Sequence, residues 1–509
     1  MLTHGDMTIY TYLQKQVQKY KDKPFICYKD EEITYQYMLT RSNQTASWLL
    51  NYGIKKGDTI AVMTRNSPFF YDLWFGCAAI GAIILPINTA STVRELQYLL
   101  EHSDSKAFLY EEELITEKHL EMAYDLSLLI YQTLSMDWRH ECSRLEDLCH
   151  DFKILASDVC AIMYTSGTTS KPKGVLITHE NYLYAGHSSV LYQALTPEDR
   201  YLIFLPLFHV NSQYYTSMAA FVAGGTICLL EKFCASTFWD EIQRLNPTVS
   251  SFVATIIKIL IELPSHPYEK NHHIRQVGYG LFVNKNDIRT FTERFGIKLI
   301  QWYGMTESIT TNIVTPLYED MPEDPDTGIM AMGKPGLGQE IKIVDENSNV
   351  VPAFEVGQII VKSPSLMQGY YKNEIETNKT IQNGWLYTGD KGYRNKEGFI
   401  WFVDRDKDLI KRAGENVSSI EIENVISSYQ GVADCAVIGI PDNLREEAII
   451  AYISTDGSNI SEEEIRAFCA EQLSRFKVPQ EFKFVEEFPR TSIGKIQKNL
   501  LRQNHPIKI

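Results

Sequence analysis

Long apolar runs are missing from this chain. None of its 509 residues lies in a stretch that approaches the roughly 20 consecutive apolar residues of a membrane-spanning helix. The N-terminus lacks the basic region and apolar core of a signal peptide, and no repeat or low-complexity tract is present. These absences predict a cytoplasmic protein with no integral membrane segment.

Paired cysteine motifs and an excess of basic residues are missing as well. The nine cysteines are scattered, odd in number and without a C-x-x-C pair, which predicts reduced thiols rather than a disulfide frame or a metal site. The formal net charge is −15. Because like charges repel, this balance argues against nucleic acid or an anionic membrane as the main partner.

The composition is that of a soluble globular protein, with 44% apolar and 22% charged residues. A chain of this length exceeds a single core, so two or more domains are expected. Apolar strands alternate with helix-like segments in the first half, which predicts a parallel α/β sheet with right-handed crossovers. The expected strands include residues 59–63, 83–86, 107–110, 201–205, 225–230 and 249–253.

The pattern changes twice further along. Near residue 340, short strands alternate with turns, which predicts a small β-barrel-like subdomain. After the charged run Asp404–Asp408 the pattern is a compact α+β one. We therefore expect a large N-terminal domain over residues 1–404 and a small C-terminal domain over residues 405–509.

A polar loop, Tyr164–Gly174, lies between two apolar segments. Its glycines let the backbone approach a ligand closely, and its hydroxyls, N–H groups and lysines suit a polyphosphate. An ordinary P-loop is excluded, because Pro172 replaces the second glycine and Gly174 stands where Ser or Thr must follow the lysine. A solvated surface loop is the plain alternative.

Three later motifs carry chemistry of the same kind. In Tyr303–Glu307 an aromatic face suits a purine, and a carboxylate offers the hard oxygen that Mg²⁺ prefers. In Tyr387–Asp390 an aspartate after a glycine can accept hydrogen bonds from ribose hydroxyls. In Pro489–Lys495 a lysine follows a glycine near the end of the sequence, where a lysine by itself is normally only solvated.

The loop and these motifs resemble the signature of the adenylate-forming enzymes, the superfamily of acyl-CoA synthetases, luciferases and peptide-synthetase adenylation domains. The motifs run in the family's order from residue 164 to residue 495, so the resemblance covers nearly the whole chain. Two glycine positions depart from the family form: Ser170 stands where glycine is usual, and Ala413 stands where a second glycine is frequent.

The resemblance implies roles for individual residues. The ATP and AMP site would comprise Thr165, Ser166, Gly167, Thr168, Thr169, Lys173, Tyr303, Thr306, Asp390, Arg405 and Lys411. The catalytic residues would be Lys495, Thr168, Glu307 and His209, and Mg²⁺ would be held by Glu307 and Thr168. Lys407 would be the hinge of a mobile C-terminal domain. The coenzyme A tunnel would include His209, Gly414 and Glu415, and the acyl pocket Asn211, Leu281, Phe282 and Trp302.

The implied activity is a two-step ligation by an acyl-CoA synthetase. A carboxylic acid and ATP form an acyl-adenylate and pyrophosphate, and the thiol of coenzyme A then displaces AMP. Segments such as Pro206–Gln213 and Lys411–Val417 look most like the crotonobetaine/carnitine-CoA ligase branch. The alternatives are a medium- or long-chain fatty or aryl acid as substrate, or a carrier-protein thiol as acceptor. A homodimer is also left open.

Trp302 stands next to Tyr303, where the family usually has a small residue. One hypothesis is that the indole shortens the acyl tunnel or offers its π face to a trimethylammonium group. The alternative is a tryptophan that only packs.

Overall fold

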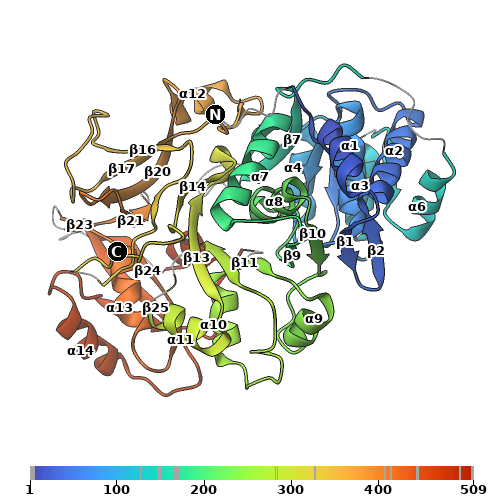
Figure 1. Ribbon diagram of the computed structural model, residues 1–509. Helices are drawn as coiled ribbons and strands as arrows, with labels where there is room; N and C mark the ends of the chain where they lie inside the picture. Colours follow the sequence, from blue (N-terminus) through green and yellow to red (C-terminus); the bar gives the residue numbers. More distant parts are fainter. Residues whose placement is uncertain are drawn as a thin grey trace.

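Figure 1 shows the computed structural model of the chain. The structure describes residues 6–126, 128–145, 152–165, 172–280, 283, 285–325, 328–405, 408–412, 415–442, 446–491 and 494–505. Two large mixed sheets form the body of the molecule. A β-rich subdomain and the C-terminal domain lie together beside them (Figure 1).

The first large sheet has nine strands in the order β15-β14-β13-β12-β11-β9-β10-β1-β2. Its centre, from β1 to β13, is parallel, whereas β2, β14 and β15 pair antiparallel at the edges. The strands are β1 (Pro24–Tyr28), β2 (Glu31–Thr34), β9 (Arg200–Ile203), β10 (Thr226–Leu229), β11 (Val249–Val253), β12 (Gln276–Gly280), β13 (Lys298–Gly304), β14 (Thr311–Val314) and β15 (Lys334–Pro335).

The second large sheet has seven strands in the order β18-β8-β7-β4-β3-β5-β6. Strands β7, β4, β3, β5 and β6 are parallel, but β8 runs antiparallel to β7 and to β18. The strands are β3 (Thr59–Met63), β4 (Ile83–Pro86), β5 (Ser105–Tyr110), β6 (Ile130–Thr133), β7 (Val159–Thr165), β8 (Lys173–Thr178) and β18 (Gly369–Tyr370).

The polar loop therefore joins two antiparallel strands, β7 and β8. The alternation of strands and helices in the sequence had indicated that the parallel arrangement continues through this loop. The antiparallel direction follows from the length of the connection: a short loop can return the chain antiparallel, whereas a parallel return needs a crossover of about a dozen residues. The pairing of Thr165 with Lys173 closes the hairpin next to the loop.

Helices fill the space between and around the large sheets, and one apolar core draws on both sheets. Helix α3 is buried along almost its whole length, as its apolar sequence predicts. The helices of the N-terminal part are α1 (Ile9–Tyr20), α2 (Tyr35–Asn51), α3 (Pro68–Ile80), α4 (Val93–His102), α5 (Glu117–Asp125), α6 (Met136–Ser143), α7 (His179–Gln193), α8 (Met218–Ala223), α9 (Phe238–Leu245), α10 (Ala254–Glu262), α11 (Lys285–Phe295) and α12 (Glu374–Thr380).

The β-rich subdomain is an antiparallel sheet of five strands in the order β16-β17-β20-β19, with β21 also paired to β20. This segment confirms the β-rich pattern predicted near residue 340. The strands are β16 (Glu340–Val344), β17 (Gly357–Lys362), β19 (Ile381–Gln382), β20 (Trp385–Arg394) and β21 (Ile400–Arg405).

The C-terminal domain has its own sheet and its own apolar core, whose buried members run from Ile410 to Phe482. An independent core is what defines a separate folding unit. Its elements are β22 (Ile410–Arg412), β23 (Glu415–Val417), α13 (Ser419–Ser427), β24 (Val432–Asp442), β25 (Glu446–Thr455), α14 (Glu462–Gln472), β26 (Glu481–Phe484) and α15 (Lys498–Asn504). The predicted fold class, a large α/β part with a small α+β domain, is confirmed.

Candidate active site

The carboxyl ends of the parallel strands β11, β12 and β13 meet at one edge of the nine-stranded sheet. In open α/β sheets this edge is where ligands bind. Thr255 follows β11, and the 3₁₀ turn Thr306–Ser308 follows β13. Tyr303, which is predicted to bind the purine, and Glu307, which is predicted to bind the metal, therefore lie at the edge where such sheets bind ligands.

Three residues that are predicted to bind the nucleotide come together from two different sheets. The phenol of Tyr303 on β13 donates a hydrogen bond of 2.6 Å to Oδ2 of Asp390 on β20. Arg405, which is paired with Asp390 in the β20–β21 register, places its Nε 3.4 Å from Oδ1 of the same carboxylate. Tyr303, Asp390 and Arg405 thus form one cluster, although 102 positions separate its ends in the sequence.

Glu307 has a partner that sequence reasoning missed. Its carboxylate is buried, with 7% of the residue exposed, and its Oε1 accepts a 2.8 Å hydrogen bond from the phenol of Tyr370. Burial raises the pKa of this carboxyl, although Tyr370 and the cation of Lys173 act in the opposite direction. Lys173 lies over the Tyr370 ring, 4.3 Å from its centroid. No motif included Tyr370.

His209 lies just before an irregular helix. Burial lowers the pKa of its imidazole to about 4, so the side chain is neutral near pH 7. A seven-residue π-helix, Asn211–Ser217, follows it. Such helices are rare and occur often at functional sites, and this one carries Asn211 of the predicted acyl pocket.

Trp302 packs closely against Gly278 of the neighbouring strand β12: a Cβ atom built on that glycine would lie 2.0 Å from Cζ2 of the indole. The rings of Trp302 and of Tyr215, from the π-helix, make an edge-to-face contact with centroids 6.0 Å apart. Gly278 is therefore required by close packing rather than by backbone conformation.

The lysine loop of the C-terminal domain rests near the carboxyl edge. A Cβ atom built on Gly494 would lie 3.3 Å from Oγ1 of Thr255, and Thr491 and Lys495 exchange backbone and side-chain hydrogen bonds that close the turn. A second contact is made by Lys258 of α10, whose Nζ is 3.3 Å from the carbonyl oxygen of Ala433. Lys495 thus belongs to a turn that packs against Thr255, which follows β11 at the carboxyl edge of the sheet.

The remaining predicted residues are less informative. Thr165 closes the hairpin with a long 3.5 Å contact to the carbonyl of Lys173. Lys411 is exposed on β22. Thr306 opens the 3₁₀ turn, and Glu415 opens β23. Ser166, Gly167, Thr168, Thr169, Leu281, Phe282, Lys407 and Gly414 lie outside the described residues.

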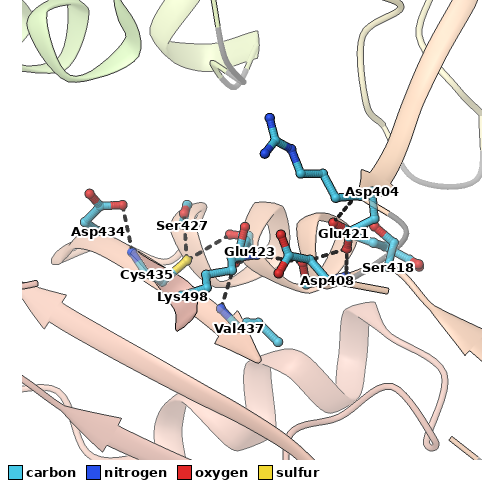
Figure 2. Close-up of polar contacts among 12 residues, drawn as sticks. Asp404, Asp408, Ser418, Glu421, Glu423, Ser427, Asp434, Cys435, Val437 and Lys498 are labelled. Carbon is cyan, nitrogen blue, oxygen red and sulfur yellow. Dashed lines mark hydrogen bonds and ion pairs between the residues drawn. The ribbon is translucent and has the colours of Figure 1, made fainter. Parts of the chain in front are cut away.

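A polar network at the start of the C-terminal domain was also missed (Figure 2). Asp404, 2% exposed at the end of β21, accepts 2.7 Å hydrogen bonds from the N–H and the hydroxyl of Ser419. That hydroxyl in turn accepts from Nζ of Lys498 at 2.7 Å, and Lys498 is 2.6 Å from Oε1 of Glu423. The network therefore joins the last strand of the β-rich subdomain to α13 and α15. The position of Lys498, three residues after Lys495, was a signal that could have pointed to it.

The fold and the family matches define an adenylate-forming ligase. The pattern of the "AMP-binding enzyme" family matches residues 13–371, and that of the "AMP-binding enzyme C-terminal domain" matches residues 421–495. The chain belongs to the AMP-binding enzyme family.

Curated relatives narrow the class to AMP-forming acid–CoA ligases, which use a carboxylic acid, ATP and coenzyme A. The crotonobetaine/carnitine–CoA ligase of Citrobacter koseri is 38% identical over 92% of this chain and 93% of its own length. The enzyme of the same name from Proteus mirabilis is 37% identical over 93% and 94%. The predicted enzyme class is confirmed.

Solved structures agree on the fold. ATP-bound MatB from Rhodopseudomonas palustris has a TM-score of 0.88 at 27% identity, over 98% of this chain and 99% of that one. The o-succinylbenzoate CoA synthetase of Bacillus subtilis, in complex with its acyl-adenylate, has a TM-score of 0.86 at 27% identity, over 99% and 100%. In the described part of this chain, no helix has both the length and the apolarity to span a bilayer.

Proposed function

We propose that this ligase activates a short, polar carboxylic acid of the betaine type, namely carnitine, crotonobetaine or γ-butyrobetaine. The names of the curated relatives support this substrate class. Cytoplasmic location and a homodimer stay predictions.

Buried polar atoms around Trp302 carry the proposal. The indole Nε1 of Trp302, the phenol oxygen of Tyr215 and Oδ1 of Asn211 are buried and have no hydrogen-bond partner among the described residues. Asn211 lies about one turn before Tyr215 on the π-helix, so both face a similar direction. An unpaired buried polar atom costs about 1–3 kcal/mol. The acyl-chain hydroxyl of carnitine could pair with one of these atoms, whereas an alkyl chain could not.

The runner-up is a medium- or long-chain fatty or aryl acid. The packing of Trp302 on Gly278 disfavours a long chain, because the indole already fills the space above that glycine. The π faces of Trp302 and Tyr215 suit a trimethylammonium group instead.

We propose a mechanism of two steps. The carboxylate of the acid attacks the α-phosphorus of ATP and expels pyrophosphate, and the thiol sulfur of coenzyme A then attacks the acyl carbon and expels AMP. Tyr303 and Asp390 hold the nucleoside, and Lys495 stabilises charge that gathers on the α-phosphate. His209 is neutral and lines the route of the thiol. Catalysis is positioning and charge neutralisation.

Mg²⁺ fits this site. Glu307 supplies a buried hard oxygen, and a single protein carboxylate is what Mg²⁺ commonly takes when nucleotide phosphates and waters provide the other ligands. Thr168 is proposed as its second protein contact. The ion would neutralise charge on the phosphates.

The C-terminal domain is proposed to rotate about a hinge between Asp404 and Lys407, with the domain boundary at residues 404 and 405. The sheet of the β-rich subdomain ends at Arg405, and the next strand, which starts at Ile410, belongs to the other sheet. Apo MatB has a TM-score of 0.78, against 0.88 for its ATP-bound form. This difference within one relative supports a change in the arrangement of its parts.

A ligation assay tests the substrate. The protein is incubated with ATP, Mg²⁺, coenzyme A and one acid of a panel, and the thioester is identified by mass. The panel contains carnitine, crotonobetaine, γ-butyrobetaine, butyrate, octanoate, palmitate and an aryl acrylate. We expect a betaine thioester. If only a fatty or aryl thioester forms, the proposed substrate is wrong and the proposed mechanism stands. Adenylate without any coenzyme A product would point to a carrier-protein thiol.

Trp302→Gly tests the packing argument. Removing the indole opens space above Gly278, so we expect kcat/KM for octanoate to rise at least tenfold and that for the preferred betaine to fall by about tenfold, since one lost cation–π contact is worth about 1–2 kcal/mol. Trp302→Phe is the matched control, because it retains an aromatic face. Equal use of octanoate by wild type and Trp302→Gly would contradict a short pocket.

A further inference from the structure

Tyr370 lies between Glu307, the proposed metal ligand, and Lys173, which the family resemblance assigns to the nucleotide site. Its phenol donates to Oε1 of Glu307 at 2.8 Å, while the ammonium of Lys173 lies 4.3 Å from the centroid of its ring. The hydroxyl of Tyr370 thus contacts a carboxylate, and the face of its ring contacts a cation.

The backbone around Tyr370 is fixed from several directions. Strand β18 pairs antiparallel with β8, which places Tyr370 opposite Val175, two residues after Lys173. The N–H of Tyr370 donates to Oγ1 of Thr377 in α12 at 2.8 Å. The N–H of Met367 donates to the carbonyl of Glu307 at 2.9 Å. The segment before α12 therefore holds the turn of Glu307 and the hairpin of Lys173 in one rigid unit.

Burial gives these contacts their strength. Tyr370 is 5% exposed and Glu307 is 7% exposed, and in such surroundings a hydrogen bond to a charged group is stronger than one in water. The phenol occupies one carboxylate oxygen and fixes the plane of the carboxylate. A ligand carboxylate that is oriented in this way binds a metal better than one that rotates freely.

Lys173 has a second partner on the other side. Its Nζ lies 3.3 Å from Oε2 of Glu376 in α12. The π face of Tyr370 and this carboxylate hold the ammonium between them, beside the hairpin whose loop is proposed to bind the polyphosphate. An ammonium held between two partners needs less ordering when a phosphate arrives.

We propose that Tyr370 is a positioning residue that orients the Glu307 carboxylate through its hydroxyl and the Lys173 ammonium through its ring, and so couples metal binding to polyphosphate binding. The proposal rests on the proposed function, because it takes Glu307 as the metal ligand. The two effects of Tyr370 can be tested separately. Its hydroxyl orients the proposed metal ligand Glu307, and its ring orients the ammonium of Lys173.

Calorimetry distinguishes the effect of the hydroxyl from that of the ring. The ligand is α,β-methylene-ATP, which resembles ATP but cannot be cleaved between its α- and β-phosphorus atoms. Its Kd is measured with and without saturating Mg²⁺. For Tyr370→Phe we expect the gain in affinity from Mg²⁺ to shrink about tenfold, the lower end for a residue that orients a metal ligand. The affinity without Mg²⁺ should stay unchanged because the ring remains. Tyr370→Leu should also weaken binding without Mg²⁺.

Tyr371→Phe is the matched control. It removes the same hydroxyl one residue later, where the phenol donates to Oδ2 of the exposed Asp104 at 2.9 Å, away from Glu307. This variant should bind the analogue as wild type does. If Tyr370→Phe retains the full gain from Mg²⁺, the inference is wrong and the proposed function stands. If wild type itself gains no affinity from Mg²⁺, the assignment of Glu307 fails together with the inference.

Should Tyr370→Phe fold poorly, Tyr370→Met provides the second variant, because it fills a similar volume without a hydroxyl. Melting of each variant with and without Mg²⁺ and the analogue adds a readout that does not depend on turnover. The metal-dependent rise in the melting midpoint should be smaller for Tyr370→Phe and Tyr370→Met than for Tyr371→Phe. An equal rise in all three would overturn the proposal.

Discussion

Lys495→Ala is expected to slow formation of the acyl-adenylate by about 100- to 1000-fold, the cost of removing one preorganised group that faces developing charge. The ammonium is positioned by a turn in which Thr491 and Lys495 bond to each other, and this turn packs against Thr255 at the carboxyl edge. Pyrophosphate release with saturating acid measures this step. Binding of ATP should change much less, because other residues hold the nucleoside.

The second half-reaction provides the control for Lys495. Synthetic acyl-adenylate and coenzyme A bypass the step at the α-phosphate, so the variant should form thioester at a rate close to that of wild type. This split distinguishes a catalytic loss from a general structural defect, which would slow both steps. Equal loss in both half-reactions would contradict the proposed role of the ammonium.

Lys498→Met is expected to destabilise the C-terminal domain by about 3 kcal/mol, the low end for breaking a buried ion pair by removing one partner. The low end applies because the Lys498 side chain is still 17% exposed. Without the cation, the carboxylates of Glu423 and Asp404 repel each other. The unfolding transition of the C-terminal domain, or amide exchange in α13 and β24, measures the loss.

The pH dependence of this variant has a definite sign. Burial raises the pKa of Glu423 and of Asp404, and Lys498 opposes that rise in both. In Lys498→Met the folded state therefore binds protons more readily than the unfolded state, and its stability increases as the pH falls. The deficit relative to wild type should shrink between pH 7 and pH 5.

Two further variants sharpen this test. Lys362→Met removes the cation of an exposed pair with Glu340, whose N–O distance is 3.5 Å, and should cost less than about 1 kcal/mol. The double variant Lys498→Met with Glu423→Gln should recover part of the loss, since it removes the uncompensated charge as well. A Lys498→Met protein as stable as Lys362→Met would show that the network of Figure 2 contributes little.

The network also bears on the proposed hinge. Asp404 belongs to the sheet of the β-rich subdomain, whereas Ser419 and Lys498 belong to the C-terminal domain. Its contacts therefore span the place where the chain passes from one part to the other. A weaker network should also change how the two parts are oriented.

The sequence by itself determined the local elements and the family. The strands at residues 59–63, 83–86 and 249–253 are where the apolar patterns placed them. Such patterns report burial within a few neighbouring residues, which is a local property. The family was indicated by the motifs at Tyr164–Gly174, Tyr303–Glu307 and Pro489–Lys495, because their order and spacing can be read directly from the sequence.

Only the tertiary structure decided which side chains meet. Tyr370 reaches Glu307 across 63 positions, and Lys498 reaches Ser419 across 79. The register of β18 on β8 sets the first contact, and the packing of α15 against α13 sets the second. Trp302 lies on Gly278 because β12 and β13 are neighbours in the sheet. These contacts depend on strand order, hairpin direction and register, which no local pattern encodes, because they are fixed by how the whole chain buries its apolar surface.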